Sequence, residues 1–175
     1  MGLIMVKAIK PSKLKFDPIR LECLSEMHKV SRLVRDDLEK TTETWTHAPT
    51  WKEEITLRDP GPTFYVYATG PEALIYKFVD EGTKPHEIWA GWYTGKSEHK
   101  RLAFPSMFEP KTVPNEIASY AGSSGGPTVY AAHVNHPGTT ARRFLSILQE
   151  KWDSLFKDHI EDAMKRAAEK SGHKL

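Results

Sequence analysis

Apolar residues recur along this chain at two spacings, which divide it into helical and strand-like segments. In the first segment they step by four, three, four and four residues: Cys23, Met27, Val30, Val34 and Leu38. This period places them on one face of a helix. Asp17 followed by Pro18 is a helix-start signal, because the proline removes only an N–H that would lack a partner inside the helix. We therefore predict a helix from Asp17 to about Thr44.

An alternation with a period of two follows from Trp51 to Arg58, as expected of a half-buried strand. Two further apolar runs, Phe64 to Ala68 and Leu74 to Val79, are rich in residues that fit a pleated surface. Turn-forming tracts separate the three runs at Asp59 to Pro62 and at Gly70-Pro71. The pattern predicts three antiparallel strands joined by tight turns.

The middle of the chain has short strand patterns between long irregular tracts. Ile88 to Ala90 and Leu102 to Phe104 bracket a charged tract with two glycines, Gly91 to Lys100, which is typical of a hairpin tip. Pro105 to Gly126 shows no strong period and is longer than the loops that compact domains usually leave unstructured. We expect this loop to be disordered or ordered by a neighbour, and we expect a strand from Thr128 to Val134.

A wide apolar stripe near the end of the chain predicts a long packing helix from about Thr140 to Ala168. Its members are spaced by threes and fours: Leu145, Leu148, Trp152, Leu155, Phe156, Ile160, Ala163, Met164 and Ala167. Arg142 and Arg143 fall in the predicted first turn, where the positive end of the helix dipole disfavours cations. Either an acidic group nearby, such as one on another subunit, compensates, or the arginines are exposed and the small penalty is absorbed.

These elements predict an α+β fold with an N-terminal helix, a mostly antiparallel sheet with a long Pro/Gly-rich loop, and a C-terminal amphipathic helix packed on the sheet. Residues 1–16 are too short and broken in pattern for a confident element, so we interpret them as an arm. Residues 17–175 are expected to form a single domain, with the extended loop at 105–126. A chain of 175 residues can bury a real core without disulfides or metal.

Composition narrows the classes of protein further. The single cysteine, Cys23, cannot form an intramolecular bridge, which favours synthesis in a reducing cytoplasm. No apolar run approaches the roughly 18 to 20 residues that cross a bilayer, and the first residues lack the features of a signal peptide. We therefore expect no membrane partner. With 25 basic against 23 acidic side chains, the net field is too weak to recruit DNA by counterion release alone.

The residues that suggest a metal site are four histidines near predicted strand ends and three acids beside them: His86, His99, His133, His136, Asp80, Glu81 and Glu87. The sequence contains no H-E-x-x-H, paired C-x-x-C or acidic calcium loop. His133 and His136, three residues apart on a strand, would also point to opposite faces. No G-x-S-x-G or phosphate-binding loop is present. We predict no catalytic residue, no metal and no cofactor.

Two tracts place a Pro or Gly bend beside a Thr and a His, directly after an apolar run. The first elbow is Glu81-Gly82-Thr83-Lys84-Pro85-His86, and the second elbow is Val134-Asn135-His136-Pro137-Gly138-Thr139. Glycine can adopt positive φ, proline fixes its own φ, and threonine hydroxyls can hold neighbouring backbone. We expect each elbow to set the angle at which the chain leaves its strand.

The two elbows resemble those of the tail-completion, or minor tail, protein family of long-tailed double-stranded DNA bacteriophages, the group that includes the lambda-type minor tail protein Z. In that family a strand with an aromatic residue and an acidic pair leads into Gly-Thr-Lys-Pro-His, which Phe78 to His86 match. A Leu-x-Phe stretch follows, matched by Leu102 to Phe104. A strand ending in Val-x-His-Pro-Gly-Thr, with an aromatic shortly after it, is matched by Val134 to Thr139 and Phe144. Family members often carry a proline before that aromatic, where this chain has Arg142-Arg143.

The resemblance implies a virion structural protein without catalytic activity, which acts in tail completion and head-tail joining at the neck. It implies that the partners are further copies of the chain in a hexameric ring, the tail terminator, the tail tube and the head-closure proteins, with passing genomic DNA as a further candidate. The location would be the tail and neck of the virion, and the host cytoplasm during assembly. We expect residues 1–16 and the loop from Pro105 to Gly126 to make the intersubunit contacts.

Two other functions remain open at this point. A small metal-dependent hydrolase would use His86, His136 and Glu81. A DNA-binding module would use the basic residues at the two ends of the chain: Lys7, Lys10, Lys13, Lys15, Lys165, Arg166, Lys170 and Lys174.

Overall fold

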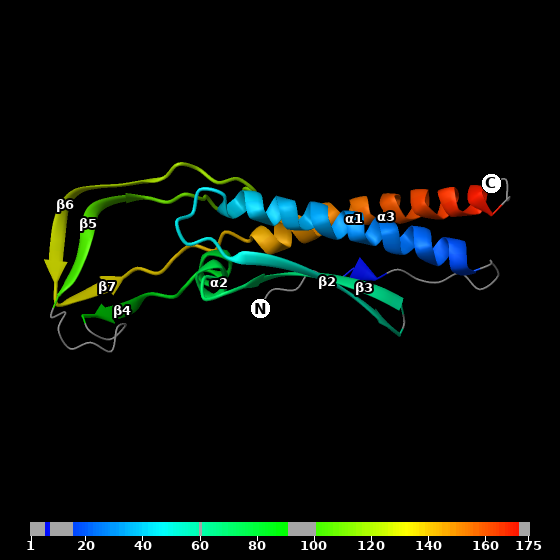
Figure 1. Cartoon of the computed structure of the whole chain (residues 1–175). Helices are drawn as coiled ribbons and strands as arrows, with labels where there is room; N and C mark the ends of the chain where they lie inside the picture. The colour runs from blue at the N-terminus through cyan, green and yellow to red at the C-terminus, as the bar shows by residue number, and fades with distance from the viewer. Residues whose placement is uncertain (1–5, 8–15, 60, 91–100, 172–175) are drawn as a thin grey trace.

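Two long helices lie side by side and form one end of an elongated molecule (Figure 1). The computed structural model describes residues 6–7, 16–59, 61–90 and 101–171. Helix α1 (Phe16–Thr42) contains the Asp17-Pro18 start signal in its first turn. Its predicted apolar face is the core face: Cys23 is half-buried, and Met27, Val30, Val34 and Leu38 have no exposed surface.

A three-stranded antiparallel sheet packs against α1, in the order β1-β3-β2. Strands β2 (Thr50–Arg58) and β3 (Gly61–Thr69) form the predicted hairpin, and Trp51, Phe64 and Val66 point into the core. The third strand is β1 (Val6–Lys7), which pairs with β3. The prediction that the third strand follows β3 in sequence is therefore wrong, and two residues of the expected arm take that place.

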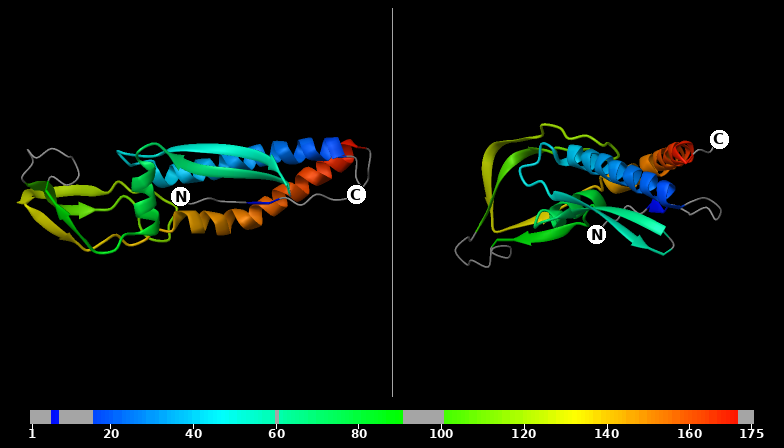
Figure 2. Two further views of the ribbon diagram at one scale, coloured as in Figure 1. Left: turned by 90° about the horizontal axis from the view of Figure 1, so that it is seen from below. Right: turned by 45° about the vertical axis from the view of Figure 1, so that its right-hand side comes forward.

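The segment predicted as the third strand is helix α2 (Ala73–Glu81). Its β-favouring composition is overridden because residues four apart, Tyr76 and Asp80, are both buried on the side that faces the rest of the molecule. The opposite side exposes Leu74 and Phe78. Figure 2 shows that α2 lies where the helices and the three-stranded sheet meet the remaining strands.

Helix α3 (Phe144–Lys170) packs along α1 and begins later than the predicted Thr140. Five members of its predicted stripe are buried, and so is Phe144 before them, whereas the predicted member Leu155 is exposed. The buried members are Leu148, Trp152, Phe156, Ala163 and Ala167. The Phe156 ring lies 5.5 Å from the ring of Phe64, which joins α3 to β3 as well. Helices packed on antiparallel sheets confirm the α+β class. None of the described helices combines the length and apolar character needed to cross a membrane.

The remaining strands form two separate two-stranded ribbons that extend from the α2 end (Figure 1). Strand β4 (His86–Trp89) pairs with β7 (His133–His136), and β5 (Leu102–Glu109) pairs with β6 (Ser123–Ala131). The prediction that Ile88 to Ala90 pairs with Leu102 to Phe104 in a hairpin is therefore wrong. The predicted tip of that hairpin, residues 91–100, lies outside the described residues.

The predicted unstructured loop from Pro105 to Gly126 is strand at both of its ends, in β5 as far as Glu109 and in β6 from Ser123. Pro105 pairs with Thr128, and Met107 pairs with Gly125 across an irregularity in register. A two-stranded ribbon tolerates these residues because each strand has one unpaired edge, where a proline removes no ladder hydrogen bond. The connection at 110–122 returns to the helices, where Asn115 N donates to Arg142 O (3.1 Å). The same connection contacts Thr44, whose hydroxyl bonds the Ser119 hydroxyl (2.6 Å).

Candidate functional site: a paired elbow between the body and the ribbons

The two elbows lie against each other and form one joint, which we call the paired elbow. Thr83 and Thr139 form an antiparallel bridge. Thr83 N donates to Thr139 O (2.9 Å), and Thr139 N donates both to Thr83 O (3.2 Å) and to the Thr83 hydroxyl oxygen (3.0 Å). The sequence indicated that each elbow sets its own exit angle, whereas the structure shows that each elbow holds the other.

Glycine is required at both bends of the paired elbow. Gly82 has φ 75° and Gly138 has φ 87°, which L side chains rarely adopt. The backbones also approach closely. A Cβ at Gly82 would lie 2.6 Å from Thr139 O, and one at Gly138 would lie 2.3 Å from Thr83 O. The expectation of positive φ at these two residues is confirmed.

The histidines of the two elbows are cross-strand partners at the start of the β4–β7 ribbon. His86 pairs in register with His136, and their ring centroids are 5.0 Å apart. His86 Nδ1 donates to Lys84 O (2.8 Å), since a carbonyl oxygen can only accept. His136 Nδ1 accepts from Gly138 N (3.1 Å), since a backbone N–H can only donate. The two imidazoles therefore carry their protons on different nitrogens.

The other candidate residues surround this joint. Glu81 is the last residue of α2 and lies 3.8 Å from the ammonium of Lys77. Val134 pairs with Ile88 further along the same ribbon. Phe144 is fully buried as the first residue of α3. Pro85 and Pro137 directly precede His86 and Gly138 and hold φ near −65° by their rings.

Asp80, which the sequence suggested only as a possible metal ligand, connects the paired elbow to α3. Arg143 precedes the helix with φ 61° and makes no side-chain cap. The capping acceptor comes instead from α2, because Leu145 N donates to Asp80 Oδ1 (3.2 Å). Arg142 N and Arg143 N donate to Val79 O (3.1 Å) and Asp80 O (3.0 Å). The end of α2 and the start of α3 are thereby fastened together.

The environment of Asp80 affects its ionisation. Its side chain is buried, and burial raises the pKa of its carboxyl above the ordinary value, while the backbone N–H groups of Leu145 and Phe144 oppose that shift. Arg142 and Arg143 were predicted in the first turn of the helix, but they precede α3, and Asp80 serves as the cap of that helix. The sequence signal that could have found it is the absence of a Ser, Thr, Asp or Asn cap before Phe144.

Aromatic side chains pack behind the joint. The Tyr76 ring lies edge-on to Trp51 at 4.8 Å, and it lies 5.9 Å from Phe144. An open groove of about 300 Å³ runs beside them and is lined in part by Leu74 and Lys77. This packing fixes α2 between β2 and α3.

Two of the three residues of the hydrolase hypothesis, His86 and His136, lie next to each other as cross-strand partners. Within the described part of the chain, no group of three or more His, Cys, Asp or Glu side chains is placed to hold a metal ion. His136 Nδ1 is occupied by the Gly138 N–H, and its Nε2 carries the remaining proton in the neutral ring. His99 lies outside the described residues.

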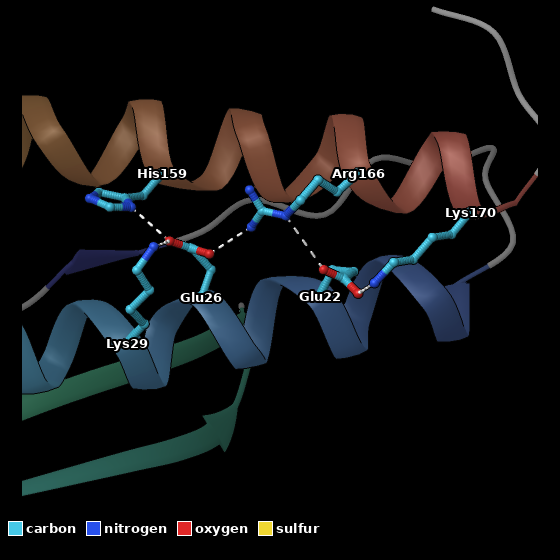
Figure 3. A network of polar contacts seen from close by, with 6 residues as sticks. All are labelled: Glu22, Glu26, Lys29, His159, Arg166 and Lys170. Atoms are coloured by element: carbon cyan, nitrogen blue, oxygen red, sulfur yellow. Dashed lines mark hydrogen bonds and ion pairs between the residues drawn. The ribbon is translucent and has the colours of Figure 1, made fainter.

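The basic residues near the C-terminal end of α3 face carboxylates of α1 (Figure 3). Glu26 accepts from Arg166 (2.6 Å) and from His159 (2.7 Å), and Glu22 pairs with Arg166 (3.7 Å) and Lys170. These contacts engage two of the charges that the DNA-binding hypothesis would use, those of Arg166 and Lys170. Of its other residues, Lys10, Lys13, Lys15 and Lys174 lie outside the described residues.

The β5–β6 ribbon exposes large apolar side chains. Met107, Phe108 and Tyr130 are 67%, 73% and 63% exposed. Among the described strands, β5 and β6 pair only with each other. A two-stranded ribbon with an uncovered apolar surface is marginally stable by itself.

Comparison with known proteins adds no relative to this picture. No protein-family model matches the chain, and no matching curated protein or solved structure was found. The fold and the paired elbow therefore define an α+β protein with an elongated two-ribbon extension.

Proposed function

We propose that this chain is a structural virion protein of a long-tailed bacteriophage, which forms a ring at the neck and acts in tail completion and head-tail joining. The ring would contact the tail terminator, the tail tube and the head-closure proteins, with genomic DNA passing through its channel. The proposal rests on the resemblance of the two elbows to the tail-completion family. It assigns no catalytic activity to the chain.

The structural observation that best supports the proposal is the extension formed by the two ribbons. Each of its four strands has one edge without a partner among the described residues, and its β5–β6 part exposes Phe108 and Tyr130. Unpaired strand edges and uncovered apolar side chains are surfaces that another protein chain can cover. Head-to-tail contacts between identical subunits close into rings when the rotation between neighbours permits it.

The paired elbow supports the proposal in a different way. A closed ring requires the same angle between its interacting surfaces in every subunit. Thr83 and Thr139 fasten the ribbons to the ends of α2 and α3, and the two close glycine contacts restrict that junction. The joint therefore presents the extension at a defined angle to the body.

The test is self-association of the full chain, measured by mass photometry and by negative-stain electron microscopy. We expect closed rings, and we expect the double substitution Phe108→Ser and Tyr130→Ser to abolish them. Leu21→Ser is the matched control, because Leu21 is also 67% exposed but lies on α1. A chain that stays monomeric even with tail tube and terminator proteins would contradict the proposed function. Rings unaffected by the double substitution would show that the β5–β6 surface is not the contact.

A further inference from the structure

We propose that the paired elbow is a proton-sensitive joint, in which protonation of His136 releases the Gly138 amide and loosens the ribbons from the body. The inference concerns a property of the monomer and does not depend on the proposed ring. It follows from the hydrogen-bonding roles of two imidazoles that face each other.

The first step concerns the proton on His136. Its Nδ1 accepts from Gly138 N–H at 3.1 Å, so this nitrogen must hold a lone pair. The bond spans two residues and holds the Pro137-Gly138 turn, where Gly138 has φ 87°. When His136 gains a proton, both ring nitrogens become donors, and Nδ1–H then faces the N–H of Gly138. The Gly138 amide then loses its side-chain acceptor.

The second step concerns the ring across the ribbon. His86 lies 5.0 Å from His136, and its Nδ1 donates to Lys84 O, a bond that survives protonation. If both rings are protonated, two like charges lie close together. Acidification therefore removes an attractive contact in the second elbow and adds repulsion between the two elbows.

The third step concerns neighbouring charges that could offset this effect. The charged residues within or directly beside the two elbows in sequence include Asp80, Glu81, Lys84, Glu87, Arg142 and Arg143. The Asp80 carboxylate accepts from α3, Glu81 lies beside Lys77, and Glu87 accepts from the Trp89 indole N–H (3.1 Å). Over the described residues, the histidine within ion-pair distance of a carboxylate is His159, which contacts Glu26. Within the part of the chain that the structure describes, no carboxylate lies within ion-pair distance of His86 or His136.

The bridge between the elbows transmits the change. Thr139 directly follows Gly138, and its N–H bonds both the carbonyl and the hydroxyl oxygen of Thr83. Gly138 itself is packed against Thr83 O so closely that a Cβ would lie 2.3 Å away. A turn that rearranges at Gly138 therefore disturbs the contact that holds the ribbons to α2.

The test is nuclear magnetic resonance of the full chain between pH 7.5 and pH 5.0. Imidazole ¹⁵N shifts should show neutral His136 with its proton on Nε2. As His136 gains a proton, the protection factors of the Gly138 and Thr139 amides should fall by roughly two- to tenfold, the range expected for loss of one hydrogen bond. A neutral His136 that carries its proton on Nδ1 would overturn the proposal.

Two variants isolate the responsible ring. His136→Asn places a side-chain oxygen that accepts from the N–H two residues on without titrating, so protection at Gly138 should become independent of pH. His133→Gln is the matched control, because it removes another histidine of β7 and should leave the pH dependence intact. A loss of protection that persists unchanged in His136→Asn would overturn the proposal. If that variant does not fold, the tautomer of His136 in the parent chain decides the matter.

Discussion

Asp80 provides, from α2, the N-terminal cap that α3 lacks locally. Replacing Asp80 with Ala leaves Leu145 N–H without its acceptor, so we expect the free energy of unfolding to fall by about 1–2 kcal/mol. Asp80→Asn keeps an oxygen at the same place and should cost less. Urea denaturation of both variants at pH 7 measures the difference. Equal losses in the two variants would show that Asp80 is not a cap.

The same carboxyl also predicts a pH dependence. Because burial raises the pKa of Asp80 in the folded chain above its ordinary value, the folded state binds this proton more tightly than the unfolded state does. Its contribution to stability therefore increases as the pH falls through the window between those two values. The free energy of unfolding of the parent chain should rise relative to that of Asp80→Asn over this window. Parallel curves for the two proteins would argue against the raised pKa.

Within the paired elbow, Gly138 leaves the least space for a side chain. Gly138→Ala combines an unfavourable φ with a Cβ 2.3 Å from Thr83 O, so we expect it to destabilise the chain by about 2 kcal/mol or more. Gly125→Ala is the matched control, since nothing lies within 4 Å of a Cβ at that glycine. Denaturation midpoints should separate the two variants. Similar midpoints would mean that the elbows can move apart at little cost.

At the scale of elements, the spacing of apolar residues predicted the helices and strands whose form depends only on residues close in sequence. The stepping of Met27, Val30, Val34 and Leu38 identified the core face of α1, because a helix buries residues at that spacing whatever its partner is. The alternation from Trp51 identified β2, because successive side chains of a strand point to opposite faces and only one face meets the core. Where a segment is short and mostly apolar, as Leu74 to Val79 of α2 is, composition cannot distinguish helix from strand.

Pairing over long separations could not be predicted from those local patterns. Strand β4 joins β7 rather than β5, although β5 follows it in sequence. The similarity of the two elbows was visible in the sequence, but their contact depends on two backbones meeting at Thr83 and Thr139. The cap from Asp80 depends on the same contact between distant segments. The sequence therefore identified the residues of the two elbows but not the contacts that join them.

The contacts between α1 and α3 should make the helix pair sensitive to acid. Burial alone would raise the pKa of Glu26, but hydrogen bonds from His159 and Lys29 and the charge of Arg166 hold it below the ordinary value of 4.5. A lowered folded pKa contributes stability at higher pH that is lost as the pH falls through the window below 4.5. We expect Glu26→Gln to cost about 1–3 kcal/mol at pH 7 and much less in strong acid.

Urea unfolding at pH 7 and in strong acid measures this effect. Asp162→Asn is the control, because it breaks an exposed pair with Lys165 (3.3 Å) on the same helix and should change stability little at either pH. If Glu26→Gln lowered the free energy of unfolding at pH 7 no more than Asp162→Asn does, the ion pairs between α1 and α3 would contribute little to the stability of the fold.

At the scale of the whole molecule, the body and the extension differ in how each is supported. Strands β2 and β3 pack on α1 around Phe64 and Val66, whereas β5 and β6 leave Met107 and Phe108 uncovered. In the isolated subunit we expect the backbone amides of β5–β6 to exchange with solvent at least about tenfold faster than those of β2–β3, because an unsupported ribbon opens easily. Hydrogen exchange measured by mass spectrometry on the monomer provides the comparison, with β2–β3 as the internal reference.

Under conditions in which the chain self-associates, protection should rise in β5–β6 and stay constant in β2–β3, because only the ribbon gains a covering surface. Equal protection of both pairs in the monomer would show that the extension is stable alone and has no need of a partner.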